Sequence, residues 1–279
     1  MKRRGMLINV LKSLILYSSL LTIVVIMVFP FIWMFSSSFK PLSEIFSYPP
    51  SIIVKNATWD NYIQLFTRYY FDRAFINSSY ISALYTAGAV FFCSLAGYGF
   101  AKYNFKGRFV LFFIVLGSMM IPFEVTMVPL YLIFKNLGWI DRHIGLIIPG
   151  LANAFGIFFM HQYMQGISNE IIESGRIDGC SEFGIFIKLI FPIIRPAIAS
   201  LGIIFFMNSW NNFLWPLIIL KSRENLTLAV ALRNFESGIR TPYHLIMAGS
   251  VVSILPLLII FFVFQKQFIS GIMSGAVKG

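Results

Sequence analysis

Long apolar runs dominate the chain and alternate with short polar stretches. A helix that crosses a membrane needs roughly 20 apolar residues, because the hydrocarbon core is about 30 Å thick and each helical residue rises about 1.5 Å. Six runs reach this length: Leu14 to Ser37, Ser79 to Ala101, Phe109 to Phe134, Ile144 to Met164, Ala197 to Leu220 and Tyr243 to Phe264. The pattern predicts an all-α membrane protein with six transmembrane helices, built as one polytopic domain over residues 1–279.

Composition leads to the same class of protein. Hydrophobic residues make up 58% of the chain, charged residues 12%, and the mean hydropathy is +0.79. A soluble domain of this length is far less apolar. The first run follows Lys2, Arg3 and Arg4, as in a signal peptide, but it is longer than the roughly 7 to 15 apolar residues of a signal-peptide core. We therefore interpret it as a membrane anchor.

The distribution of positive charge predicts the topology. Lysine and arginine collect in the cytoplasmic loops of membrane proteins. Cations precede the first run, and the short loop from Lys102 to Arg108 carries three of them and no acid. We therefore expect both termini in the cytoplasm. The net charge of +11 then reflects orientation and contact with anionic membrane lipids, and a nucleic-acid partner is not expected.

The chain offers little catalytic chemistry. It contains no G-x-x-x-x-G-K-[ST] phosphate loop, so ATP hydrolysis by this chain is excluded. The histidines His143, His161 and His244 lack the spacing of metal ligands, and Cys93 and Cys180 lie in different predicted environments. We predict reduced cysteines, no catalytic residues, and neither a metal nor a cofactor bound by this chain.

The most informative polar stretch is the insert at residues 165–196, between the fourth and fifth runs. Ser168 can cap a short helix. Asp178 and Gly179 supply a turn, the glycine through its access to positive φ. Ser181 can then cap a second helix. The insert therefore predicts a helix, a sharp turn and another helix on the cytoplasmic side.

One side of this elbow has the chemistry of a docking surface. Glu173 lies in an early turn of the first helix, where a carboxylate complements the positive end of the helix dipole. Ser174 and Gly175 are small, so the backbone on their side could enter a groove on another protein. A solvated loop that merely contains turn residues is the alternative interpretation.

Two further polar features fall inside apolar runs. Asn208, Trp210, Asn211 and Asn212 interrupt the fifth run and are candidate lining for a solute path, since amides bind hydroxyl groups and aromatic faces pack on sugar rings. Hydrogen bonding between helices is an equally good interpretation. Glu124 in the third run would suit a proton-coupled secondary transporter, but no second acid or arginine partner accompanies it within the runs.

The insert also carries a family resemblance. Glu173, Gly179 and Pro192 match in order and spacing the E-A-A-x-x-x-G…I-x-L-P signature of binding-protein-dependent ABC importer permeases, with Ser174 and Gly175 as departures. Other similar runs are FPFIWMFSSSFKP from Phe29, WDNYIQLF from Trp59, LAGYGFAKYNFKGR from Leu95 and SWNNFLWPL from Ser209. Together these resemble the maltose-type permeases for carbohydrate uptake, in particular the smaller maltose permease subunit.

The resemblance implies a type I ABC importer permease fold in a bacterial inner membrane. It also implies a second homologous permease, a dimer of cytoplasmic ATPase subunits that bind ATP and Mg, and an extracytoplasmic sugar-binding protein. In this family the insert docks on the ATPase. By resemblance the coupling residues are Glu173, Ser174, Gly175, Asp178 and Gly179. The predicted function is then a non-catalytic permease subunit that forms half of the path for a sugar or oligosaccharide.

Overall fold

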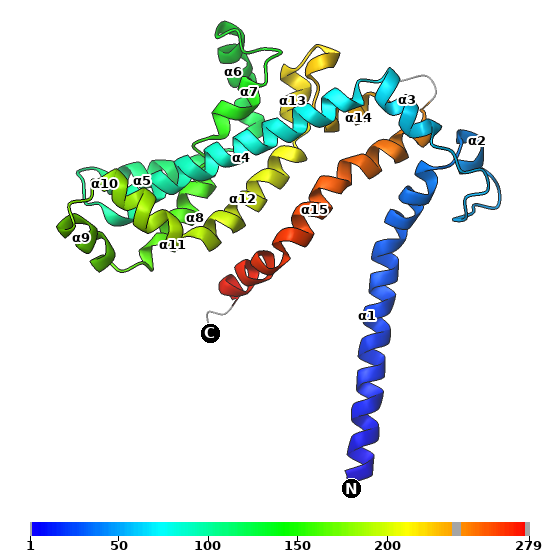
Figure 1. Cartoon of the computed structure of the whole chain (residues 1–279), viewed down its shortest axis with the longest axis horizontal. Helices are drawn as coiled ribbons and strands as arrows, with labels where there is room; N and C mark the ends of the chain where they lie inside the picture. Colours follow the sequence, from blue (N-terminus) through cyan, green and yellow to red (C-terminus); the bar gives the residue numbers. More distant parts are fainter. Residues whose placement is uncertain (1, 236–240, 277–279) are drawn as a thin grey trace. The chain divides into compact units, whose positions relative to one another are not determined.

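The computed structural model describes residues 2–235 and 241–276, and every regular element in these ranges is helical. Among the described residues, four helices are long and apolar enough to cross a membrane, and up to six spans result if each of two sharply bent helix pairs counts as one. The predicted all-α membrane class is confirmed. Figure 1 labels the helices along the chain.

The chain divides into two compact units, Met1–Tyr69 with Asn234–Ile254, and Tyr70–Arg233 with Leu255–Gly279. The first unit contains α1 (Lys2–Ser38), α2 (Leu42–Ile45), α3 (Asp60–Arg68) and the first part of α15 (Tyr243–Ala276). The prediction that the whole chain is one domain stays a prediction.

The end of α1 in the first unit is held by polar contacts. The Asn61 side chain is buried and donates hydrogen bonds to the carbonyls of Ser38 and Lys40 at 2.8 and 2.9 Å. The Tyr62 hydroxyl donates to Ser38 Oγ at 2.8 Å. By contrast, the described residues of the chain bury none of the most apolar window of α1, within Leu11–Ser38.

The second unit holds the remaining helices. They are α4 (Phe71–Lys102), α5 (Arg108–Ser118), α6 (Phe123–Asn136), α7 (Ile144–Ile147), the 3-10 helix η1 (Ile148–Gly150), α8 (Ala154–Gln165), α9 (Glu170–Ile177), α10 (Glu182–Ile185), the π-helix η2 (Phe186–Ile190), α11 (Phe191–Ile193), α12 (Arg195–Trp210), α13 (Leu214–Ile219), the 3-10 helix η3 (Arg223–Asn225) and α14 (Leu228–Asn234), whose last residue falls in the first unit.

Helix α4 packs along α8 and α12, and this contact forms the centre of the second unit. Small residues let the backbones approach. A Cβ added at Gly97 would lie 2.7 Å from Met160 Cβ and 2.9 Å from the backbone nitrogen of His161. Gly97 therefore serves helix packing, as its position in an apolar run predicts.

Two of the predicted spans are not single helices in the structure. The third run forms α5 and α6, which meet at an angle of 101°. Pro122 lies at the break, and without an N–H it cannot continue the hydrogen bonding of α5. The fifth run ends as α12 at Trp210 and restarts as α13. Sequence hydropathy alone does not register such bends.

Hydrogen bonds join the loop before α7 to the segment that follows α13. Asp141 Oδ1 accepts hydrogen bonds from the backbone N–H groups of Lys221 and Ser222 at 2.8 and 3.0 Å, and Asn225 donates to the Asp141 carbonyl at 2.8 Å. Burial acts to raise the pKa of Asp141, but these hydrogen bonds outweigh it and hold the pKa below the usual value. The carboxylate is thus a fixed acceptor at neutral pH.

Candidate functional site

The insert folds as the elbow that its turn residues predict. Ser168 Oγ accepts the N–H of Glu170 at 3.3 Å, at the start of α9. After α9 the chain turns at Gly179, where φ is +76°, a value that glycine adopts without steric cost. Ser181 then caps α10 by accepting the N–H of Gly184 at 3.1 Å. The predicted helix, turn and helix are confirmed.

The second half of the elbow leads into α12 through a sharp bend. The π-helix η2 follows α10, and the N–H of Phe191 reaches back to the carbonyl of Phe186. The segment Glu182–Ile193 then meets α12 at 81°. Residues Ile185, Phe186 and Ile190 are fully buried in the hydrophobic core of the unit. The elbow is therefore anchored on its inner side.

Gly175 lies on the inner face of α9. A Cβ at this position would lie 2.8 Å from Leu189 Cδ1 and 3.0 Å from Ile185 Cγ1. Its small size serves the close packing of α9 on η2, so the expectation that Gly175 offers open backbone to another protein is wrong. Glu173 and Ser174 do lie exposed on the outer side.

The outer surface of the elbow also carries apolar side chains that the sequence did not single out. Ile177 is 87% exposed and Phe183 is 57% exposed. Asp178 and Gly179 lie exposed beside Ile177. Helical spacing could have indicated this exposure, because Ile177 lies on a different face of α9 from the buried Ile172. The outer side of the elbow thus exposes two large apolar side chains next to polar ones.

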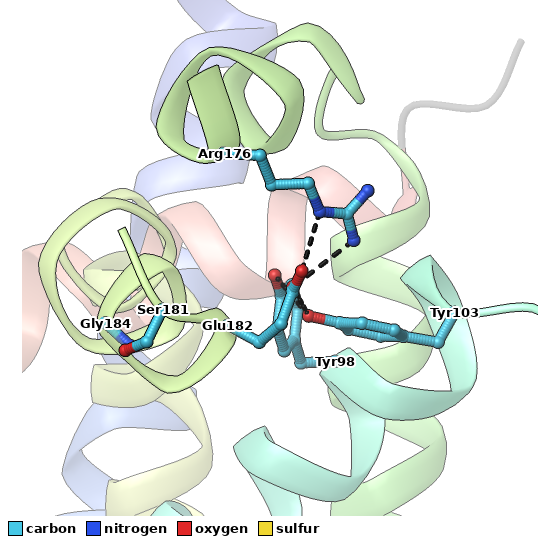
Figure 2. A network of polar contacts seen from close by, with 6 residues as sticks. All are labelled: Tyr98, Tyr103, Arg176, Ser181, Glu182 and Gly184. Atoms are coloured by element: carbon cyan, nitrogen blue, oxygen red, sulfur yellow. Dashed lines mark hydrogen bonds and ion pairs between the residues drawn. The ribbon is translucent and has the colours of Figure 1, made fainter. Parts of the chain in front are cut away.

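A network of polar contacts joins the two halves of the elbow to the end of α4 (Figure 2). Arg176 donates to both carboxylate oxygens of Glu182, from Nε at 2.7 Å and from Nη2 at 3.2 Å. The Tyr103 hydroxyl donates to the same carboxylate, and it lies 3.3 Å from the Tyr98 hydroxyl. Sequence reasoning missed this network because its members are far apart along the chain.

The network has fixed protonation states at neutral pH. The hydrogen bonds from Arg176 and then from Tyr103 hold the pKa of Glu182 below its usual value. Burial, followed by the hydrogen bond to Glu182, raises the pKa of Tyr103. The carboxylate therefore stays charged as the acceptor, and the phenol stays protonated as a donor.

The polar residues at the end of α12 differ in exposure. Asn208 on α12 is exposed, as are Asn211 and Asn212 in the turn that follows the helix. Trp210 is only 4% exposed and stacks on Phe206 with ring centres 5.7 Å apart. Trp210 is therefore buried within this chain, and its place in a solute path stays a prediction.

Comparison with known proteins decides the family. The family model described as "Binding-protein-dependent transport system inner membrane component" matches residues 89–273. This chain belongs to that family. It is thus a multi-pass membrane component of an ABC transporter, and the predicted permease family is confirmed.

Several characterised permeases are similar over nearly the whole chain. The arabinooligosaccharides transport system permease protein AraQ of Bacillus subtilis (strain 168) is 42% identical over 255 residues, which cover 90% of each chain. The lactose transport system permease protein LacG of Rhizobium radiobacter is 33% identical over 268 residues, covering 96% of this chain and 97% of LacG.

Solved structures share the fold. The crystal structure of a bacterial ABC transporter involved in the import of the acidic polysaccharide alginate matches with a TM-score of 0.82 and 24% identity, covering 90% of this chain and 95% of that chain. At this identity the match carries the fold alone, which is the expected importer permease fold.

The position of Glu124 in the permease also bears on the alternative function. Glu124 lies exposed in the first turn of α6, directly after the break at Pro122. An acid at the start of a helix complements the helix dipole, which accounts for it without proton transport. Membership of the permease family does not favour the proton-coupled secondary transporter.

Within the described residues, no group of three metal-ligating side chains gathers.

Proposed function

We propose that this permease imports a sugar or oligosaccharide and forms half of its path, together with a second homologous permease subunit. The relatives named above transport arabinooligosaccharides and lactose, and this common chemistry supports a saccharide as the substrate. The further partners are an extracytoplasmic sugar-binding protein and a pair of ATPase subunits that bind ATP and Mg. The chain lies in a bacterial inner membrane.

The elbow and both termini face the cytoplasm in this proposal. The support comes from the cationic loop between α4 and α5, which contacts the elbow directly. Lys102 donates to Asn169 Oδ1 at 3.0 Å and also to the carbonyl of Ile167. Because such cationic loops stay in the cytoplasm, the elbow that they touch belongs on the same side.

The elbow is the docking surface for the ATPase. Ile177 and Phe183 provide exposed apolar contacts, and Glu173 and Asp178 add negative charge beside them. An apolar cleft with a basic rim on the partner would complement this surface. Ser174 lies on the same exposed side and is small enough for close approach, whereas Gly175 and Gly179 shape the elbow itself.

The solute path is lined by the exposed amides at the end of α12. Asn208, Asn211 and Asn212 can donate to and accept from the hydroxyl groups of a sugar, and amides inside a membrane need a polar surrounding of this kind. The same residues could instead bond to the second permease subunit, so transport by variants decides between the two roles.

Affinity purification from native membranes tests the proposal. Wild type is expected to bring down an ATPase and a second permease, and Ile177→Asp is expected to lose the ATPase. Ile63→Asp is the matched control, because Ile63 is 57% exposed on α3, away from the elbow sequence. Recovery of wild type without any ATPase, or equal recovery with both variants, would contradict the docking role.

A further inference from the structure

We propose that the last turn of α4 holds α9 in its docking orientation through Lys102, Tyr103 and Glu182, and thereby couples movement of the elbow directly to α4. These side chains are positioning residues for transport. The inference rests on the proposed docking of the elbow on an ATPase. These contacts would connect the elbow to α4, in addition to its two covalent connections to α8 and α12.

The covalent connections alone leave the orientation of the elbow weakly defined. On one side, a non-helical segment of a few residues separates α8 from α9. On the other side, the 81° bend before α12 passes through Ile194, whose ψ of 9° departs from the α-helical value. Segments at the ends of helices are where hinge motion is absorbed. A force on α9 would therefore bend the chain at these two connections, and would not move the rest of the unit, unless other contacts held the helix.

Glu182 provides such a contact, because three segments meet at its carboxylate (Figure 2). The carboxylate belongs to α10, Arg176 reaches it from α9, and Tyr103 reaches it from the residue that follows α4. The two bonds from Arg176 form a fork, which fixes orientation as well as distance. The guanidinium carbon of Arg176 also lies 5.8 Å from the centre of the Tyr103 ring, a cation–π distance that closes the triangle.

Lys102 fixes the opposite end of α9. Its ammonium group donates to the Asn169 side chain at 3.0 Å, and Asn169 is the residue directly before α9. Because Lys102 and Tyr103 are adjacent in sequence, the end of α4 contacts α9 at both of its ends. Rotation of α9 about either joint would have to break one of these contacts.

The arrangement is better suited to orientation than to stability. Arg176 and Glu182 are about half exposed, with side-chain exposures of 46% and 51%, and ion pairs in water contribute little to folding. Helix α4, in contrast, packs along both α8 and α12, the helix that ends in the exposed asparagines. A displacement of α9 that moves α4 should therefore also move α8 and α12, which pack on it.

Transport per ATP hydrolysed is the readout that separates positioning from folding. The complete importer is purified with wild-type permease, Glu182→Gln or Tyr103→Phe, and reconstituted in liposomes for parallel measurement of saccharide uptake and ATP hydrolysis. Tyr103→Phe removes only the hydroxyl, so it remains informative if Glu182→Gln assembles poorly. Glu224→Gln is the control, since it breaks the exposed Arg73–Glu224 pair of 3.6 Å elsewhere in the unit.

Both elbow variants are expected to keep the ATPase bound and to lose at least about fivefold in uptake per ATP, at the lower end of usual coupling factors, while the control keeps the wild-type ratio. Unchanged ratios in both variants, with a wild type that couples normally, would overturn this inference alone. Loss of the bound ATPase would also overturn it, because Glu182 would then belong to the docking surface. A wild type without ATP-driven uptake would refute the proposed function, and this inference with it.

Discussion

Replacing Gly97 by alanine is expected to force α4 away from α8. The added Cβ would lie 2.7 Å from Met160 Cβ and 2.9 Å from the backbone nitrogen of His161, and neither atom belongs to a flexible side-chain end. The helices must therefore separate by several tenths of an ångström. Overpacking of this kind costs about 1–3 kcal/mol, and the higher helix propensity of alanine returns about 1 kcal/mol at most. With the full gain subtracted, the net expectation is destabilisation by up to about 2 kcal/mol.

Gly99→Ala is the matched control on the same helix, because a Cβ at Gly99 meets no atom within 4 Å. Thermal unfolding of the purified protein in detergent measures the difference. A loss of 1 kcal/mol lowers the midpoint by roughly 2–4 °C in a protein of about this size, so Gly97→Ala should melt below wild type by a few degrees. Gly99→Ala should melt at or above wild type. Equal midpoints for the two variants would refute the packing of α4 on α8 described here.

Three other predictions concern the elbow and the path. Gly175→Leu should lower the thermal midpoint through about 1–3 kcal/mol of overpacking. Ser174→Leu should leave the midpoint unchanged and reduce the recovery of the ATPase. The reverse pattern would contradict the inward placement of Gly175. The folded pKa of Glu182 lies below its unfolded value, so its contribution to stability is present above about pH 4.5 and disappears as the pH falls through the folded value. Because the ion pair is half exposed, wild type and Glu182→Gln should differ only slightly in thermal midpoint at pH 7, and this difference should vanish in acid. A difference that persists in acid would disprove that linkage. Alanine at both Asn211 and Asn212 should reduce saccharide uptake with the ATPase still bound, and unchanged uptake would remove these residues from the path.

Local sequence signals predicted the elbow well. Ser181 and Gly179 act within a few residues of themselves, one as a helix cap and the other through its positive φ, and both appear in the structure as predicted. The close contact of Gly97 with Met160 likewise depends on the small size of one residue. Such features depend on neighbouring backbone or on residue size, and both can be read from a single sequence.

Features that depend on the direction of a side chain or on distant partners escaped prediction. Tyr103 and Glu182 are 79 positions apart, so nothing local relates them. Gly175 was expected on an open side of the elbow but packs inward, because residue type alone does not give the rotation of a helix about its axis. The sharp break at Pro122 does not follow from hydropathy, which continues across it while the helical hydrogen bonding does not.

Site-specific photo-cross-linking at Ile177 tests the docking role of the elbow most directly. A photoreactive residue replaces Ile177 in the intact importer in native membranes, and another replaces Ile63 as the exposed control. The account predicts a cross-link from position 177 to an ATPase subunit and none from position 63. An intact, transport-competent importer that gives no ATPase cross-link from position 177 would contradict it.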